Sequence, residues 1–153
     1  MRVDQVGRRS LLHTVPLWIN PARSVYFITI CCTPRHMNQL CHKQLALLLF
    51  ETVEHRCRQK TWFAHVFLLM PDHVHALLRF PSTKTPMRKI ISQWKAWTAK
   101  QFGIRWQRDF FEHRLRNDEN WIEKANYILA NPVRASLIEK PEDWEYVWFP
   151  KPE

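Results

Sequence analysis

The stretch from Trp62 to Phe80 constrains the fold of this chain more than any other segment. It consists of two runs rich in β-branched, aromatic and aliphatic residues, residues 62–70 and 73–80, which are separated only by Pro71 and Asp72. Two such runs on either side of a short break with proline predict a tight β-hairpin. The chain therefore contains an antiparallel sheet, because strands joined by so short a turn cannot run parallel.

Strands and helices alternate along the rest of the chain. The predicted elements are a strand over residues 26–33, a helix over 38–60, the hairpin, a helix over 85–102, a weak strand over 105–111 and a helix over 118–131. Thr85 is expected to cap the second helix with Pro86 at its first position, and Gly103 to end it. The tail after residue 139 is expected to be irregular. This order predicts an α+β fold of the ferredoxin-like (split βαβ) type, with helices packed on one side of an antiparallel sheet.

The length of 153 residues fits a single domain, with an N-terminal arm over 1–24 and a C-terminal tail over 139–153. No apolar run is long enough to span a membrane, and the first ten residues lack the apolar core of a secretory signal. We therefore expect a cytoplasmic protein without a membrane partner.

The charge of the chain favours a polyanionic partner. Lys and Arg number 23 against 14 Asp and Glu, a net charge of +9, although residues 118–153 hold only four cations against eight acids. Such an excess favours nucleic acid as the first candidate partner. Aromatic residues among the cations could stack unpaired bases, but helical spacing predicts that Trp94 and Trp97 lie in the core. The candidate nucleic-acid-binding residues are Arg88, Lys89, Lys95, Arg105, Arg108, Lys124 and Arg134.

Two histidines in the second strand of the hairpin are candidate metal ligands. Side chains alternate along a strand, so His73 and His75 point to one face, ~6–7 Å apart along the strand. At this spacing both imidazoles can converge on one divalent cation. The alternative is a pair of solvent-facing or hydrogen-bonded histidines, because the pattern His-x-His is common by chance.

The last predicted helix carries a candidate nucleophile. Its apolar stripe comprises Trp121, Ile122, Ala125, Ile128 and Leu129. Tyr127 lies opposite the centre of this stripe, and Asn131 follows it by one turn. An exposed tyrosine, or one that caps a strand, is the alternative. A divalent metal held by His73, His75 and Asn131 could assist attack of the phenol on a phosphodiester, and such a ligand set suits Mg²⁺ or Mn²⁺.

Two motifs together resemble a known family. MPDHVHALL and, further along the chain, YILANPVRASLI are similar to signatures of the REP-associated tyrosine transposases, relatives of the single-tyrosine HUH transposases. The resemblance extends from Tyr26 to Trp144. It implies an HUH nuclease type of fold that acts on single-stranded or hairpin DNA from palindromic repeats. It also implies that Tyr127 forms a 5′-phosphotyrosine, that His73, His75 and Asn131 hold the metal, and that no nucleotide cofactor is needed. A monomer and a homodimer are both open.

The sequence departs from the family pattern at two positions. Asp72 stands where Asn is frequent, and Ser136 where Gly is frequent. Asp72 either orients a histidine or shapes the turn, and the turn is the favoured interpretation. Arg134 either pairs with phosphate or holds the helix end, and His113 is a candidate neighbour of the site.

Two further functions stay open beside the nuclease and strand transferase. One is a non-catalytic protein that binds DNA or RNA hairpins. The other is a metal-dependent phosphodiesterase that uses activated water instead of Tyr127.

Overall fold

The computed structural model describes residues 23–82, 84–116 and 120–152, so most of the predicted N-terminal arm lies outside it. Its centre is a five-stranded sheet with the order β4-β1-β3-β2-β5, in which all neighbours are antiparallel. The strands are β1 (Val25–Cys31), β2 (Phe63–Met70), β3 (His73–Arg79), β4 (Phe111–Arg114) and β5 (Val147–Trp148). The order of the first four strands is that of a split βαβ unit, so the predicted α+β fold is confirmed.

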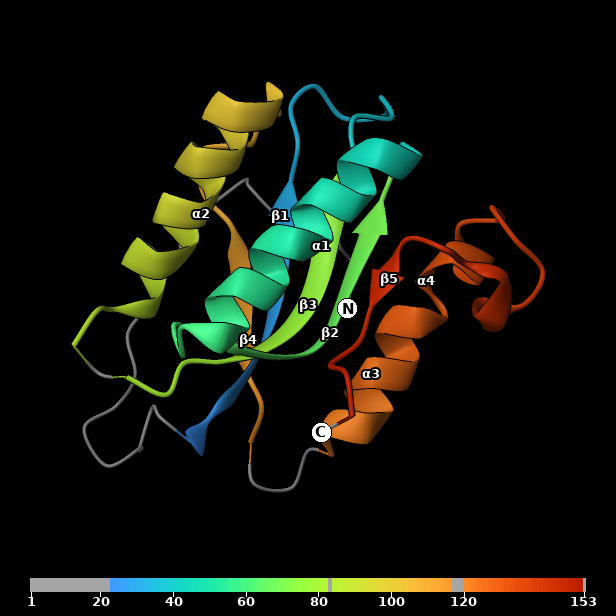
Figure 1. The fold of residues 1–153 in the computed structure, drawn as a ribbon. Coiled ribbons are helices and arrows are strands. Elements are labelled where there is room, and N and C mark those ends of the chain that lie inside the picture. The colour runs from blue at the N-terminus through green and yellow to red at the C-terminus, as the bar shows by residue number, and fades with distance from the viewer. Residues whose placement is uncertain (1–22, 83, 117–119, 153) are drawn as a thin grey trace.

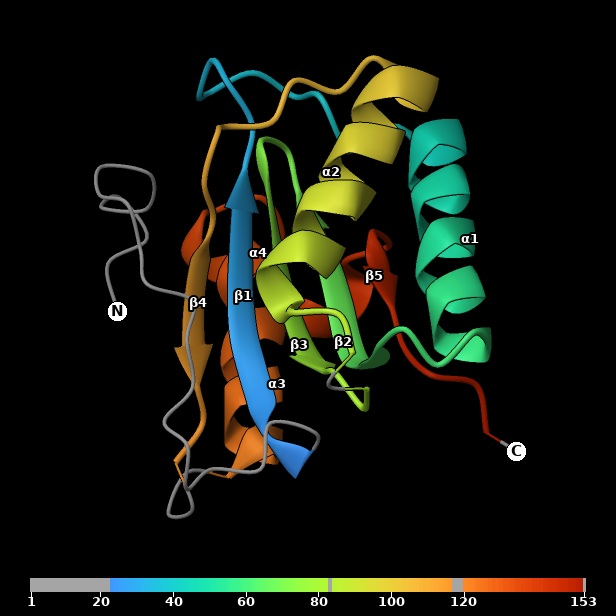
Figure 2. The same cartoon turned by 90° about the vertical axis from the view of Figure 1, so that its left-hand side faces the viewer.

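Helices cover both faces of this sheet (Figures 1 and 2). They are α1 (Lys43–Arg58), α2 (Met87–Phe102), α3 (Trp121–Leu129) and the short α4 (Asn131–Arg134). We call the two sides of the sheet the α1/α2 face and the α3 face. The sequence predicted helices on one side only, and α3 departs from that prediction. Both sides of the central strands are apolar, so each side needs a cover.

The α1/α2 face holds the larger core. Tyr26, Ile28 and Ile30 of β1 point into it and pack with Trp62 and Trp94, which are fully buried. The α3 face holds a smaller core. Its fully or almost fully buried members are Phe27, Val66, Leu68, Met70, Leu77, Ala125 and Ile128. The alternation along β1 and β3 therefore supplies two cores from the same strands.

The hairpin forms as predicted. β2 ends at Met70, β3 begins at His73, and these two residues face each other across the turn of Pro71 and Asp72. The register shifts between Ala64 and Val66, which marks a β-bulge in β2.

Two helix starts differ from the prediction. Residues 38–42 form a turn in which the side-chain oxygen of Asn38 accepts a hydrogen bond from the Cys41 amide at 2.8 Å, so α1 begins at Lys43. Pro86, not Thr85, occupies the N-cap of α2. Gly103 ends α2 with φ of 70°, the left-handed conformation that a helix C-terminus favours in glycine.

Two strand predictions are wrong. The strand expected over residues 105–111 is a loop with a single bridge between Trp106 and Cys32, and β4 follows it. The tail, expected to be irregular, contributes β5, which pairs Trp148 with Phe67 of β2. A strand of two residues has no periodicity that a sequence pattern can reveal.

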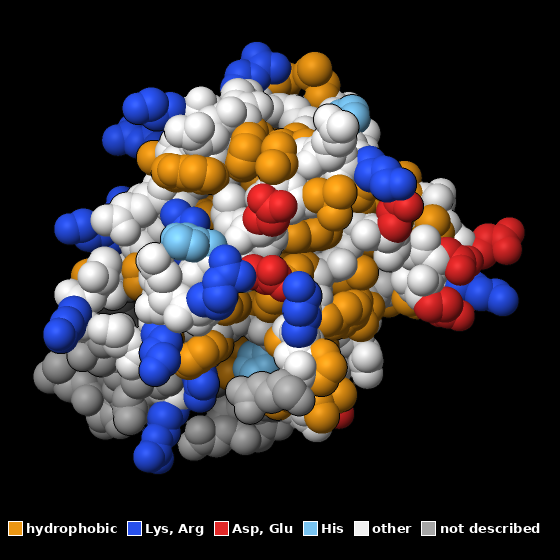
Figure 3. Space-filling view, viewed as in Figure 1, with side chains coloured by type: hydrophobic (Ala, Val, Ile, Leu, Met, Phe, Trp, Pro, Cys, Tyr) orange, Lys and Arg blue, Asp and Glu red, His pale blue; other side chains and the backbone are white. Residues whose placement is uncertain are grey.

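The surface of the α1/α2 face mixes positive charge with apolar side chains, and the cations gather on the side that α2 forms (Figure 3). Arg88 and Lys89 are exposed there. Trp97 is also 44% exposed, so its predicted place in the core is wrong, whereas Trp94 is buried as predicted. Among the described residues, no helix is both long and apolar enough to cross a membrane.

Candidate active site

His73 and His75 lie side by side on the α3 face. Val74 and Ala76 belong to the core under α1 and α2, so the predicted alternation along β3 is confirmed. The two imidazole rings are 4.7 Å apart between centroids and nearly perpendicular, and both side chains are buried. Two candidate metal ligands are thus adjacent and shielded from water.

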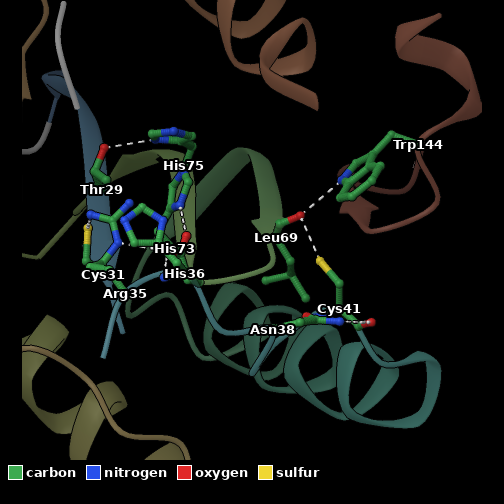
Figure 4. A network of polar contacts seen from close by, with 11 residues as sticks. Thr29, Cys31, Arg35, His36, Asn38, Cys41, Leu69, His73, His75 and Trp144 are labelled. Atoms are coloured by element: carbon green, nitrogen blue, oxygen red, sulfur yellow. Dashed lines mark hydrogen bonds and ion pairs between the residues drawn. The ribbon is translucent and has the colours of Figure 1, made fainter. Parts of the chain in front are cut away.

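Asp72 orients the ring of His73, which Figure 4 shows close to Arg35 and His36. One carboxylate oxygen is 2.7 Å from Nδ1 of His73, and the other accepts hydrogen bonds from Nε of Arg35 and the amide of His36, both at 2.8 Å. Burial alone would raise the pKa of Asp72, but these hydrogen bonds outweigh burial and hold the pKa well below its usual range. Because the ionised carboxylate can only accept, Nδ1 of His73 donates, and Nε2 points away from Asp72 as the nitrogen that a metal could bind.

This arrangement corrects the favoured interpretation of Asp72. The sequence favoured a role in the turn, yet the carboxylate holds a metal-ligand candidate and Arg35 at once. The alternative interpretation, orientation of a histidine, is the one that the contacts support.

His75 has a nitrogen that protein atoms leave unused. Its Nδ1 lies 2.9 Å from the hydroxyl of Thr29, which faces it from β1, while Nε2 is buried with no hydrogen-bond partner among the described residues. Burial first, and then the positive charges of His73, Arg134 and Arg35, hold the pKa of His75 well below its ordinary value. A neutral imidazole with a buried, unused nitrogen fits a metal ligand, since buried polar atoms otherwise find partners.

Tyr127 approaches the histidines through Phe27. Its ring packs edge-on against Phe27 at 6.5 Å between centroids, and the ring of His75 is also a neighbour of Phe27, at 5.5 Å. One phenyl side chain thus contacts both the candidate nucleophile and a candidate metal ligand. The structure brings together residues that lie far apart in the sequence.

The position of Tyr127 on its helix differs from the prediction. Asn120 caps α3 by accepting from the Ile122 amide, and Asp118, where the helix was expected to begin, lies outside the described residues. The helix packs on the sheet through Ala125 and Ile128, while Trp121 and Ile122 are 41% and 51% exposed. The predicted stripe is therefore wrong at its N-terminal end, where the helix projects past the small core. Tyr127 is half-buried at the flank, because its long ring reaches back to the sheet.

Arg134 ties Tyr127 to Asn131. Ala130 keeps a helical conformation between α3 and α4, so Asn131 stays one turn after Tyr127, as predicted. The guanidinium of Arg134 lies 3.9 Å from the centroid of the Tyr127 ring and donates to the Tyr127 carbonyl at 2.7 Å and to the side-chain oxygen of Asn131 at 2.9 Å. The sequence left two roles open for Arg134, and these contacts favour the one in which it holds the end of the helix rather than pairs with phosphate.

Three atoms could hold a metal: Nε2 of His73, Nε2 of His75 and the side-chain oxygen of Asn131. The amide oxygen has a second lone pair beside its bond to Arg134. Among the residues that the structure describes, no three His, Cys, Asp or Glu side chains are grouped to bind an ion. The two histidines would therefore need an amide oxygen, water or substrate to complete a coordination sphere.

The predicted nucleic-acid-binding cations divide into two groups. Arg88 and Lys89 lie on α2, across the sheet from the histidines. Arg105 and Arg108 are exposed in the connection after α2, which is joined to the end of β1 beside His73 by a hydrogen bond from the Gln107 amide to the Cys31 carbonyl.

Lys124 and Lys95 complete the set of predicted cations. Lys124 is half-buried on α3. The prediction for Lys95 is wrong, because its ammonium is buried and donates to the carbonyls of Gln107, Arg108 and Asp109. Burial lowers the pKa of Lys95. Its three hydrogen bonds fix the connection that precedes β4.

Sequence reasoning missed three residues of this site. Phe27 and Thr29 alternate along β1, but only the register with β3 shows that they face the histidines. Arg35 carries no signal at all, since it reaches Asp72 from a loop. His113, named as a possible neighbour, lies opposite Phe27 on β4.

Comparisons with known proteins show the family to which this chain belongs. The family model described as "Transposase IS200 like" matches residues 23–130. The chain is 25% identical over 130 residues to the REP-associated tyrosine transposase of Escherichia coli K12, which covers 81% of the chain and 75% of the relative. It is 30% identical over 98 residues to a Haemophilus influenzae protein that bears the name of such a transposase, which covers 53% of the chain. The chain spans 55% of the length of that relative.

A solved structure, described as a REP-associated tyrosine transposase bound to a REP hairpin, shares the fold. Its TM-score is 0.65 at 20% identity, with 90% of this chain and 82% of the other covered. The family match, the sequence relatives and the fold lead to one conclusion. The chain belongs to the IS200-like transposase family, and it is similar to the REP-associated tyrosine transposases within it.

Proposed function

We propose that this protein is a metal-dependent endonuclease and strand transferase for single-stranded DNA, which acts on hairpins of palindromic repeats through a 5′-phosphotyrosine. The observation that carries the proposal is the buried, unused Nε2 of His75 beside an oriented His73, on the sheet face where Tyr127 packs. The family and the REP hairpin in the related structure support DNA hairpins as the substrate class.

The reaction is an in-line displacement at phosphorus. The phenolic oxygen of Tyr127 loses its proton to solvent and forms a bond to phosphorus, and the bond from phosphorus to the 3′ oxygen breaks. That oxygen takes up a proton and leaves as a free 3′-OH, while the 5′ phosphate stays on the tyrosine. Strand joining is the reverse attack by a 3′-OH, which needs no nucleotide cofactor because the phosphotyrosine keeps the bond energy.

A bound Mg²⁺ or Mn²⁺ would polarise the phosphate oxygens and stabilise the charge that develops on them. His73, His75 and Asn131 are the residues proposed to hold it. Asp72 and Thr29 orient the two imidazoles, and Arg134 keeps Tyr127 and Asn131 on consecutive turns. The cations proposed to contact the phosphates near the site are Arg105, Arg108 and Lys124.

A covalent adduct tests this function. The protein is incubated with Mg²⁺ or Mn²⁺ and an end-labelled hairpin that carries a single-stranded flank, and the products are separated under denaturing conditions. We expect a labelled protein band that disappears with a chelator or with Tyr127→Phe. Tyr146→Phe is the matched control, because this tyrosine is also half-buried but lies in the tail beside Trp144.

The other two functions give different results in the same experiment. Cleavage that survives Tyr127→Phe without an adduct would support a phosphodiesterase that uses water. Hairpin binding without cleavage or adduct would support a non-catalytic binding protein. Either result contradicts the proposed function.

A further inference from the structure

A second cluster of aromatic and cationic side chains lies on the α3 face, at the opposite end of β3 from His73. The indole of Trp121 stacks on the imidazole of His65 at 4.4 Å between centroids and an interplanar angle of 22°. Beside it, the guanidinium of Arg79 lies 4.9 Å from the centroid of the Phe63 ring. We call Phe63, His65, Arg79 and Trp121 the Trp121 platform.

The strand pattern places this platform on the same face as the candidate active site. His73, His75 and Arg79 are separated by even numbers of residues on β3, so their side chains point to one side. Phe63 faces Arg79 directly across the strands and shares that side. The stack with Trp121 of α3 shows that His65, in the β-bulge, points there too.

Two groups of the platform are incompletely packed or hydrogen-bonded by the described residues. Trp121 is 41% exposed although His65 supports its ring. Nε of Arg79 is buried and has no hydrogen-bond partner among the described residues. A supported, exposed indole beside a guanidinium combines a stacking surface with positive charge, which is the composition of sites for unpaired nucleobases.

The distance to the nucleophile fits a short piece of single strand. Trp121 and Tyr127 are six residues apart on α3, which corresponds to ~9 Å along the helix axis. Successive nucleotides of one strand in duplex DNA rise ~3.4 Å, so this span equals a few nucleotides. A strand with its phosphate at Tyr127 could therefore place a nearby base on the platform.

We propose that the Trp121 platform stacks an unpaired base of the single-stranded DNA that flanks the hairpin, a few nucleotides from the phosphate at Tyr127. This inference rests on the proposed function for its ligand, single-stranded DNA. It assigns a base-binding role to side chains that take no part in the chemistry. Stacking of this kind is tolerant of sequence, because every base has an aromatic face.

Trp97 provides a matched control. It is 44% exposed, packs against the ring of Phe102, and lies on α2 across the sheet from the platform. Trp121→Ala and Trp97→Ala thus remove the same side chain, at similar exposure, from opposite faces of the molecule.

The test measures equilibrium binding in a Tyr127→Phe background, so that no bond is cut. Three DNA ligands are compared by fluorescence anisotropy at one salt concentration: a hairpin with a single-stranded flank, the same hairpin with abasic sites in the flank, and a blunt hairpin. We expect Trp121→Ala to weaken binding of the flanked hairpin roughly tenfold and to leave the other two unchanged. Trp121→Phe should restore most of the affinity, and Trp97→Ala should have no effect.

A double-mutant cycle makes the result independent of folding defects. Abasic sites at the stacked position should weaken binding to the Trp121-containing protein as much as Trp121→Ala does, and the two changes combined should cost no more than one of them. The proposal is overturned if the effects add, if Trp121→Ala weakens all three ligands equally, or if Trp97→Ala has the same effect. Adduct formation by the protein with Tyr127 intact is scored separately, so a failed platform and a failed nuclease give different results.

Discussion

The two faces of the sheet differ in the kind of polar group that they hold. On the α1/α2 face these are mainly indole nitrogens. That of Trp94 donates to Thr52 at 2.8 Å, that of Trp106 donates to Thr98 at 2.9 Å, and that of Trp148 is buried with no partner among the described residues. On the α3 face, Nε2 of His75 is buried with no partner among the described residues. An indole N–H can only donate, whereas an imidazole nitrogen can also bind a metal.

One sheet therefore serves two purposes. The α1/α2 face carries the larger core and stabilises the domain. The α3 face carries a smaller core and holds the two histidines and Tyr127 beside it. Changes on the first face should therefore affect stability, and changes on the second face should affect chemistry.

The largest effect is expected from the histidines of the α3 face. His73→Ala or His75→Ala should lower the rate of DNA cleavage at least ~10³-fold, because the proposed metal would supply several kcal/mol of charge stabilisation. Binding of hairpin DNA should be almost unchanged, since phosphate contacts dominate affinity. Cleavage rates and binding constants of the same preparations check this. Normal cleavage by His75→Ala would show that the unused nitrogen has no part in the reaction.

Trp94→Ala on the α1/α2 face should do the reverse. It removes a fully buried indole and its hydrogen bond to Thr52, and should lower the free energy of unfolding by about 3–5 kcal/mol. Urea denaturation measures this loss. Adduct formation per folded molecule should stay within about twofold of the parent protein. A specific loss of chemistry in the folded fraction would contradict the separation of the two faces.

Asp72 gives a graded test of ligand orientation. Asp72→Ala removes the acceptor of His73 and should lower metal-dependent cleavage ~10–100-fold, as loss of such partners does in metal sites. Asp72→Asn keeps an oxygen that accepts from His73 and should lose much less. Metal titrations of adduct formation compare the two variants. Equal losses would mean that the negative charge matters more than the orientation of the ring.

Paired cation variants show which face the DNA follows. Arg105→Ala with Arg108→Ala should weaken hairpin binding and reduce the slope of log K against log[salt] by about 2, since each phosphate contact contributes roughly 0.9. Arg88→Ala with Lys89→Ala, across the sheet, should leave the slope unchanged. If the second pair changes the slope and the first does not, DNA lies on the α1/α2 face.

The smallest effect concerns stability against pH without metal. The hydrogen bonds to Asp72 depress its pKa in the folded protein, so its ionised form stabilises the fold above the ordinary pKa of ~3.9 and that contribution is lost as pH falls below it. The stability difference between the parent protein and Asp72→Asn should therefore be constant near neutrality and shrink below about pH 4. Urea unfolding with a chelator present measures it. A difference that grows at low pH would contradict the assignment.

Features that depend only on the spacing of residues within one strand or helix could be predicted from the sequence. Alternation in residues 73–79 places both histidines on one face, and the four-residue spacing of Tyr127 and Asn131 places them on consecutive turns. Ser136, which stands where glycine is frequent in the family, adopts a φ of 60°, the conformation that glycine adopts most readily.

The remaining parts depend on contacts between distant segments. The register of β1 against β3 decides that Thr29 faces His75, and no sequence period contains that information. The cover of the second sheet face decides that Ala125 and Ile128, rather than Ile122, are buried on α3. The sequence pattern predicts that Lys95 lies on the exposed side of its helix. In the structure its ammonium is buried, because it donates hydrogen bonds to carbonyls of the connection after α2.

The identity of the covalently modified residue decides whether Tyr127 is the nucleophile. The adduct formed with Mn²⁺ and a flanked hairpin is digested with nuclease and protease, and the modified peptide is sequenced by mass spectrometry. The account predicts a phosphodiester-linked 5′ nucleotide on Tyr127 and on no other residue. A nucleotide attached elsewhere, or cleavage with an unmodified Tyr127, would contradict a site built from Tyr127 and the histidines of β3.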